Sequence, residues 1–304
     1  MGFDAELDER FRAAGFAHLR TLQLRTGGPV RLDELRFVFE GESFPLRNPQ
    51  QGIYKPRILE AALSISTAFA PRPELRPYDD SPGPDGYLRY KWREDAGPDH
   101  YTTRSLRIAL REGRPMIWFH GIAPGVYQPV FPVWLVDEEP LERQFVVAVD
   151  AMQEERWSSA EVVDLDSRRR YAESATRVKL HQPLFRARVL HAYESRCAIC
   201  RLRYRQLLDA AHIRPDSEGG EPIVPNGISL CKLHHSAYDS NLLGIDPDYR
   251  VQVRGDVLDD SDGPTLRHSI QEIHESKLSL PRQRKAQPDK DLLAERFEVF
   301  CRAS

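Results

Sequence analysis

Four sulfur and imidazole side chains in the last third of the 304-residue sequence have the spacing of a metal site. Cys197 and Cys200 are separated by two residues, and so are Cys231 and His234. A gap of two residues lets a tight turn present both side chains to one ion, and tetrahedral zinc takes four such ligands. Close-spaced cysteines in a cytosolic protein indicate a metal more often than disulfide bonds. We therefore expect these four residues to bind structural Zn²⁺.

A second group of polar residues lies between these two pairs and just after them. It comprises Asp209-Ala-Ala-His212-Ile-Arg-Pro215, then Pro225-Asn226-Gly227, then His235 and Tyr238-Asp239. In this order the residues resemble the HNH family of nucleases, and the resemblance covers about residues 188–255. It implies a ββα-metal fold with a histidine on the first strand, an asparagine before the helix and a second histidine on the helix.

The resemblance also implies a role for each of four residues. His212 is the general base, because a neutral imidazole near pH 7 can take a proton from the attacking water. Asn226 orients and polarises that imidazole or supports the metal shell, and His235 is a ligand of the catalytic ion. Asp239 lies four residues further along the same helix, so both side chains project to one face. The pair can hold Mg²⁺, Mn²⁺ or another divalent ion on the scissile phosphate.

One position departs from the family pattern. Many HNH nucleases have Asp or His immediately before the general base as a further metal ligand, and here that position is Ala211. The catalytic ion therefore has fewer protein ligands unless Asp209 or Asp239 compensates. Asp209 is either such a ligand or an ordinary surface residue.

Hydrophobic periodicity predicts the helices and strands that position these side chains. It indicates that the first half of the chain is β-rich. We expect helices over 5–25 and 101–112, and strands near 35–40, 87–93, 116–122, 127–137 and 145–150. Residues 58–69 fit a short helix or a strand. The segment 76–86 is dense in Pro, Gly and Asp and is predicted to be a loop. A domain over 1–150, built on a curved sheet or barrel, is therefore expected.

The rest of the chain is predicted to be a helical linker over 151–187 and a nuclease domain over 188–304, which gives an α+β fold class overall. Pro183 should start or kink the linker's last helix. Basic residues are frequent between 168 and 205. They form either a solvated helical face or a phosphate-contacting surface, and their place just before the site favours the second. A final helix is expected over 289–300, with Cys301 as a small core residue on its apolar side.

Three segments of the first domain resemble the SRA-like domains of the PUA superfamily, which recognise modified cytosine. They are Gln51–Pro56, the Tyr78-Asp79 loop and the strand Tyr87–Glu94. The resemblance implies that Tyr78 and Asp79 line a base pocket, with Asp79 accepting from the cytosine N4 amine. Trp118 would stack on the extruded base. Aromatic residues of β-rich domains are usually core residues, so Trp118 is equally open to internal packing.

The chain as a whole resembles bacterial SRA-like–HNH modification-dependent restriction endonucleases. We expect a type IV-like enzyme that binds double-stranded DNA, flips 5-methylcytosine or 5-hydroxymethylcytosine out, and hydrolyses a nearby phosphodiester. A double-strand cut would need a homodimer or two binding events. One alternative is an HNH nuclease that reads unmodified sequence, phosphorothioate or RNA-containing duplex. Another is a non-catalytic, zinc-stabilised DNA-binding protein.

Bulk composition adds little to this hypothesis. The formal net charge of −3 argues neither for nor against a nucleic-acid partner, because positive charge can be clustered locally. The sequence has no run of about 18 apolar residues, so no membrane span is expected. The acidic, amphipathic N-terminus lacks the apolar region of a secretory signal, and we expect a cytoplasmic protein.

Overall fold

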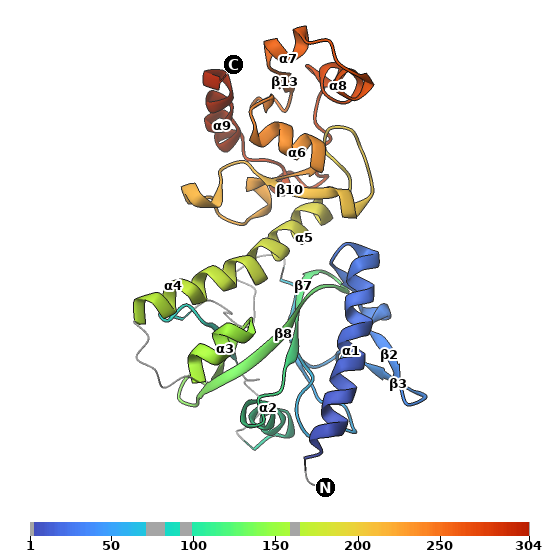
Figure 1. Cartoon of the computed structure of the whole chain (residues 1–304), viewed down its shortest axis with the longest axis vertical. Helices are drawn as coiled ribbons and strands as arrows, with labels where there is room; N and C mark the ends of the chain where they lie inside the picture. Colours follow the sequence, from blue (N-terminus) through green and yellow to red (C-terminus); the bar gives the residue numbers. More distant parts are fainter. Residues whose placement is uncertain (1–2, 71–82, 92–98, 159–164, 304) are drawn as a thin grey trace. The chain divides into compact units, whose positions relative to one another are not determined.

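The computed structural model describes residues 3–70, 83–91, 99–158 and 165–303. The chain divides into two compact units, Met1–Leu184 and Phe185–Ser304, which are described separately (Figure 1). None of the helices in these ranges is long and apolar enough to cross a membrane.

The α-helices are α1 (Ala5–Thr26), α2 (Tyr101–Arg111), α3 (Ala151–Ser158), α4 (Leu165–Thr176), α5 (Gln182–Ala192), α6 (Lys232–Asp239), α7 (Gly255–Asp259), α8 (Pro264–Ser269) and α9 (Lys290–Ala303). The strands of the first unit are β1 (Val30–Arg31), β2 (Arg36–Phe39), β3 (Glu42–Pro45), β4 (Ile53–Tyr54), β5 (Ser64–Thr67), β6 (Leu88–Lys91), β7 (Met116–Ala123), β8 (Val126–Glu139) and β9 (Gln144–Ala148). The strands of the second unit are β10 (Leu208–His212), β11 (Gly227–Cys231), β12 (Leu243–Ile245) and β13 (Val251–Val253).

The first unit is built on a curled seven-stranded sheet in the order β4-β5-β7-β8-β9-β6, with β1 also paired to β8. Only β5 and β7 are parallel among the pairs of this sheet in the described residues. The long strand β8 shifts register against both β7 and β9. Such irregularities bend a strand and increase its twist, which explains the curl. The prediction of a β-rich, curved first half is confirmed.

Helix α1 covers part of this unit together with the β2–β3 hairpin (Figure 1). The Asp4 carboxylate caps the helix by accepting from the Leu7 backbone N–H at 3.0 Å, and Gly27 ends it in a left-handed conformation with φ 74°. The Phe11 ring lies 5.0–5.1 Å from three hairpin rings, namely Phe37, Phe39 and Phe44. These edge-to-face contacts are the favoured arrangement of aromatic pairs and fix the hairpin on the helix.

The helical stretch after the sheet contains α3, α4 and α5, and it has an irregularity where Pro183 was expected to cause one. A five-residue π-helix, Arg177–His181, precedes α5, and Pro183 is the second residue of that helix. Thr176 and Gln182, on either side of the π-helix, both have the right-handed helical conformation, so the helix runs on from α4 into α5. A proline cannot donate an intrahelical hydrogen bond, and Pro183 therefore disturbs a continuous helix rather than starting one.

The second unit contains a ββα arrangement of β10, β11 and α6, in which β10 and β11 pair antiparallel. Its core is formed by buried side chains from these elements together with α5, β12, β13 and α9. On α9, Leu293 and Phe300 occupy the buried side, and Cys301 is exposed. The expectation that Cys301 is a core residue is therefore wrong, because Phe300 takes the inward position next to it.

Two further expectations are resolved by the described residues. Residues 58–69 contain strand β5 rather than a helix. The predicted strand at 87–93 is β6, whose described part ends at Lys91. Most of the predicted loop at 76–86 lies outside the described residues.

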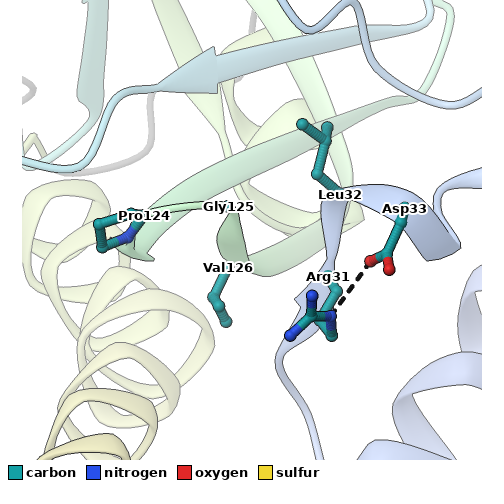
Figure 2. Close-up of a pocket in the computed structure, with 6 residues that line it drawn as sticks. All are labelled: Arg31, Leu32, Asp33, Pro124, Gly125 and Val126. Atoms are coloured by element: carbon teal, nitrogen blue, oxygen red, sulfur yellow. Dashed lines mark hydrogen bonds and ion pairs between the residues drawn. The ribbon is translucent and has the colours of Figure 1, made fainter.

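A shallow surface pocket of about 340 Å³ lies beside the turn between β7 and β8 (Figure 2). Arg31 and Asp33 line it and pair with each other at 3.2 Å, and both side chains are 70% exposed. Its charges are therefore already balanced and solvated, and the pocket offers no unsatisfied group for a ligand.

Candidate functional site

The four zinc-ligand candidates are brought together in the second unit. The ligand atoms of Cys197, Cys200, Cys231 and His234 all lie within 4.8 Å of one another. Three come from turns or a strand end, and His234 lies in the first turn of α6, whose N-cap is Cys231. Among the described residues this is the only cluster of three or more potential metal ligands at such distances.

The distances within this cluster fit a tetrahedral zinc site. Zn–S bonds of about 2.3 Å and Zn–N bonds of about 2.0–2.1 Å imply edges of roughly 3.8 Å between sulfurs and roughly 3.5 Å between sulfur and nitrogen. Cys200 Sγ lies 3.9 Å from Cys231 Sγ, and His234 Nδ1 lies 3.4 Å from Cys197 Sγ and 3.3 Å from Cys231 Sγ. Three sulfurs and one imidazole nitrogen are also the donor types that zinc prefers.

The second ring nitrogen of His234 fixes which nitrogen faces the cluster. His234 Nε2 lies 2.8 Å from the carbonyl oxygen of Ser269. A carbonyl only accepts, so Nε2 donates and Nδ1 carries the lone pair that points at the sulfurs. This arrangement is the usual support of a metal-bound histidine.

His212 lies at the end of β10, opposite Gly227 of β11. Its imidazole stacks on the Phe185 ring of α5, with centroids 4.0 Å apart and an interplanar angle of 17°. A Cβ atom at Gly227 would lie 2.8 Å from the Phe185 ring and 2.5 Å from a methyl group of Val189. Glycine at 227 therefore allows α5 to approach the strands closely enough to support the His212 ring.

The His212 imidazole makes no hydrogen bond with any of the described residues, and neither ring nitrogen is a buried, unsatisfied atom. Burial lowers the pKa of His212 below its ordinary value; nearby His235 lowers it further, whereas Asp216 and Asp239 raise it. The neutral ring is therefore favoured near pH 7, and a water molecule or substrate can reach its nitrogens.

Asn226 occupies a different place from the one expected. It is buried, and its side chain binds the loop that follows β10 rather than the imidazole. Its Oδ1 accepts from the Arg214 N–H at 2.8 Å, while Nδ2 donates to the carbonyls of Arg214 and Glu221 at 3.0 and 2.9 Å. Asn226 thus closes the loop between the two strands, and its own carbonyl accepts from the N–H of Ile213, the residue after His212, at 3.0 Å.

His235 and Asp239 lie on one face of α6, as their spacing predicts, with Nε2 and Oδ2 3.3 Å apart. On the other side of the ring, Nδ1 lies 4.0 Å from Oδ2 of Asp209. Asp209 also pairs with Arg186 of α5 at 3.3 Å. Asp209 is therefore an ion-paired neighbour of His235 and is not an isolated surface residue. Ala211 is fully buried opposite Ile228.

Sequence reasoning missed Asp216, which lies close enough to His212 to raise its pKa. Asp216 begins a short 3-10 helix after Pro215. The only signal in the sequence is a carboxylate four residues after the histidine. The loop conformation that turns it back toward the strand depends on the hydrogen bonds of Asn226, which residue order does not reveal.

Comparison with known protein families gives a match within this unit. Residues 197–246 match the HNH endonuclease family. The matched segment of this HNH unit includes all four cluster ligands as well as His212, Asn226, His235 and Asp239. A comparison with curated proteins gives no match.

Two solved structures are similar to the chain. One is the modification-dependent TagI restriction endonuclease, with 17% identity, a TM-score of 0.30, and coverage of 79% of this chain and 82% of that chain. The other is the type IV phosphorothioation-dependent restriction endonuclease ScoMcrA, with 13% identity, a TM-score of 0.25, and coverage of 62% and 48%. The alignment spans about half the length of the ScoMcrA chain.

The residues predicted for base recognition lie apart from the HNH unit in sequence. Tyr78 and Asp79 are outside the described residues. Trp118 is fully buried, stacks on His120 with centroids 4.7 Å apart, and donates from Nε1 to Thr67 Oγ1 at 2.9 Å. Trp118 is therefore a core residue in this structure, and no face of its ring is open to a base.

Several residues of the predicted basic surface have structural partners. Arg186 donates to the carbonyls of Arg205 and Leu208 at 2.8 Å, in addition to its pairing with Asp209. Arg169 pairs with Glu173 one turn along α4. These arginines hold the start of β10 and a helix face, and their contact with phosphate stays a prediction.

Proposed function

We propose that the chain is a metal-dependent endonuclease that hydrolyses a phosphodiester of double-stranded DNA in its HNH unit. The observation that carries this proposal is the place of His212. Its imidazole is supported by Phe185, favours the neutral form and has no hydrogen-bond partner among the described residues. A base that takes a proton from water must be neutral, must be held in position and must be within reach of that water.

The cluster of Cys197, Cys200, Cys231 and His234 would hold structural Zn²⁺. The fit of its distances and donor types supports this assignment. When bound, the ion would contribute folding free energy by joining the turn at Cys197–Cys200 to the start of α6. The chain's own contribution is the Ser269 carbonyl, which holds His234 in the tautomer that presents Nδ1.

His235 and Asp239 would hold the catalytic divalent ion, Mg²⁺, Mn²⁺ or another. Such an ion, when bound, stabilises charge on the scissile phosphate and the leaving oxygen. Asp209, held by Arg186, lies on the Nδ1 side of His235 and would orient the ring so that Nε2 faces the ion. In this proposal Asp209 supports a ligand rather than acting as one, and Asp239 compensates for Ala211.

In the proposed reaction, His212 takes a proton at an imidazole nitrogen from the attacking water. The Phe185 ring keeps the imidazole plane fixed during this step, and the loop closed by Asn226 fixes the end of β10. Asp216 lies where it can stabilise the imidazolium that results, because a nearby carboxylate favours the charged ring.

We further propose that cleavage depends on a modified base, 5-methylcytosine or 5-hydroxymethylcytosine, flipped out of the duplex into the first unit. The support is the SRA-like resemblance, in a reading domain over 1–150 that a linker over 151–187 joins to a nuclease domain over 188–304. Two segments that carry the resemblance contact each other, since Tyr90 Oη donates to the Gly52 carbonyl at 3.0 Å.

Digestion of one plasmid in methylated, hydroxymethylated and unmodified form tests this reading. We expect cleavage of the modified forms and little of the unmodified form. A double-strand cut would indicate a homodimer or two binding events, since one HNH site acts on one strand. Equal cutting of all three forms would show that cleavage does not depend on modification, while still supporting the nuclease activity. DNA binding without cleavage under Mg²⁺, Mn²⁺, Ni²⁺ and Co²⁺ would favour a zinc-stabilised binding protein instead.

A further inference from the structure

Three arginines of the first unit are buried among the described residues, and one of them has no carboxylate partner. Arg12 is 2% exposed and binds both oxygens of Asp8. Arg89 is 8% exposed and binds Asp85 and Glu139 through paired hydrogen bonds. Arg47 is 7% exposed, and no ion pair joins it to any of the described residues.

Among the described residues, the surroundings of Arg47 are polar and aromatic but neutral. Its Nε donates to Ser66 Oγ at 2.9 Å, and its guanidinium lies 4.4 Å from the centroid of the Tyr127 ring. Tyr90 is close enough to affect its pKa. Nη1 is buried and has no hydrogen-bond partner within the described ranges. Nη2 has no hydrogen bond either, but it is not among the buried unsatisfied atoms, so solvent reaches it.

This arrangement destabilises the folded protein unless another group supplies negative charge. Burial lowers the pKa of Arg47, which means that the charged form is poorly solvated, yet an arginine stays protonated at neutral pH. A buried charge without a partner destabilises a protein, and a cation–π contact offsets only part of that loss. In Arg12 and Arg89, by contrast, carboxylates of the same unit neutralise the buried charge.

We propose that Arg47 is the centre of an oxyanion-binding site in the first unit, and that the oxyanion is a phosphodiester group of bound DNA. The DNA source rests on the proposed function, whereas the site itself rests on Arg47 and its neighbours. Ser66 and Tyr127 hold the guanidinium by its Nε edge and one face. The Nη1–Nη2 end, where solvent reaches Nη2, is left for phosphate oxygens, which match the planar fork of arginine.

Two measurements on the full-length chain test the site. The first is thermal unfolding followed by tryptophan fluorescence, in chloride and in inorganic sulfate at equal ionic strength. All four tryptophans lie in the first unit, so this signal reports that unit alone. The second is the affinity for a fluorescein-labelled DNA duplex without divalent metal, measured at several salt concentrations.

The variant Arg47→Met removes the charge and keeps an unbranched side chain of similar length. Arg111→Met is the matched control, because Arg111 is 67% exposed and pairs only with its neighbour Glu112 among the described residues. Arg47→Met should lose the sulfate-induced rise in melting temperature and should melt no lower than the wild type in chloride. Its DNA affinity should fall about 10- to 100-fold, the usual effect of one charged hydrogen bond. The slope of log K against log salt should shrink by about 1. Arg111→Met should behave like the wild type.

Three results would overturn the proposal. A lower melting temperature of Arg47→Met in chloride would show that the chain itself neutralises Arg47. Unchanged DNA affinity and salt slope would exclude a phosphodiester contact. A response to sulfate without any effect on DNA binding would assign the site to a free inorganic oxyanion. None of these results depends on cleavage, so a failure of the nuclease proposal, seen as binding without cutting, is distinguishable from a failure of this one.

Discussion

At the residue scale, the adjacent histidines 234 and 235 belong to the two different sites that we propose on helix α6. His234 is 1% exposed and lies in the cysteine cluster, whereas His235 lies between Asp209 and Asp239. Successive residues of an α-helix point about 100° apart, so neighbours can face different ions. The sequence alone predicts this division, because His234 follows Cys231 by three positions and Asp239 follows His235 by four.

The pH dependence of cleavage follows from the environment of His212. A general base acts in its neutral form, so kcat/KM should rise with pH through the pKa of His212 and then level off. Burial lowers that pKa from an ordinary value of 6.5, so the acidic limb should lie below pH 6.5. A pH profile at saturating Mn²⁺ measures it. An acidic limb centred above pH 7 would contradict a buried, neutral His212.

In the proposed orienting role, Asp209 should affect the affinity for the catalytic ion through His235. Asp209→Asn removes the charge beside Nδ1 of His235, and losses of this kind weaken metal binding about 10- to 100-fold. Titration with Mn²⁺, followed by electron paramagnetic resonance, measures the affinity without DNA. Asp248→Asn, at an 83% exposed side chain, is the control. Unchanged Mn²⁺ affinity in Asp209→Asn would show that Asp209 does not orient His235 for the ion.

At the element scale, the loop between β10 and β11 determines where His212 and Asp216 lie. Its fold depends on Asn226, whose three side-chain hydrogen bonds join Arg214 and Glu221. Gly220 is part of the same closure, because a Cβ there would lie 2.0 Å from the Arg214 carbonyl oxygen. The loop is therefore a specific structure and not a variable connection.

Asn226→Asp tests this reading against a direct role on the imidazole. The substitution turns two donated hydrogen bonds into contacts between oxygens, which should lower the free energy of unfolding of the HNH unit by about 2–4 kcal/mol. Urea unfolding, followed by circular dichroism, measures the loss. Asn241→Asp is the control, because its Oδ1 only accepts, from Arg296. If Asn226→Asp lost cleavage but kept its full stability, the direct role on the imidazole that the sequence predicts would be supported instead.

Sequence patterns predicted the elements better than the contacts between them. Helix α1 and strands β7 to β9 follow from hydrophobic periodicity, and the zinc-ligand candidates follow from their spacing. Both patterns extend over only a few residues. The role of Asn226, the position of Asp216 and the burial of Trp118 depend on how distant segments meet, and no local pattern encodes that. Cys301 shows the same limit, because one helical position decides whether it or Phe300 is buried.

At the scale of the whole molecule, the chain is two units with separate cores, and the cysteine cluster belongs to one of them. A metal that contributes folding free energy to one unit need not affect the other. The tryptophans, all in the first unit, allow the two to be followed separately.

Removal of zinc should therefore unfold the HNH unit alone. Chelation, or Cys197→Ser, should reduce helical circular dichroism while tryptophan fluorescence keeps its native spectrum. Cys301→Ser should change neither signal, since Cys301 is exposed and outside the cluster. An HNH unit that keeps its structure after full zinc release would show that the cluster is not structural.

The proposal that this chain is an HNH nuclease depends most on His212, and one measurement tests it directly. Cleavage of a modified plasmid by wild type and His212→Ala is compared in Mn²⁺, at equal zinc content and with equal circular dichroism. The imidazole does not hold the fold through any hydrogen bond among the described residues, so the variant should fold and bind zinc normally. Its cleavage rate should fall about 100- to 10,000-fold, the range lost with a general base. Cleavage by His212→Ala at the wild-type rate would contradict the account.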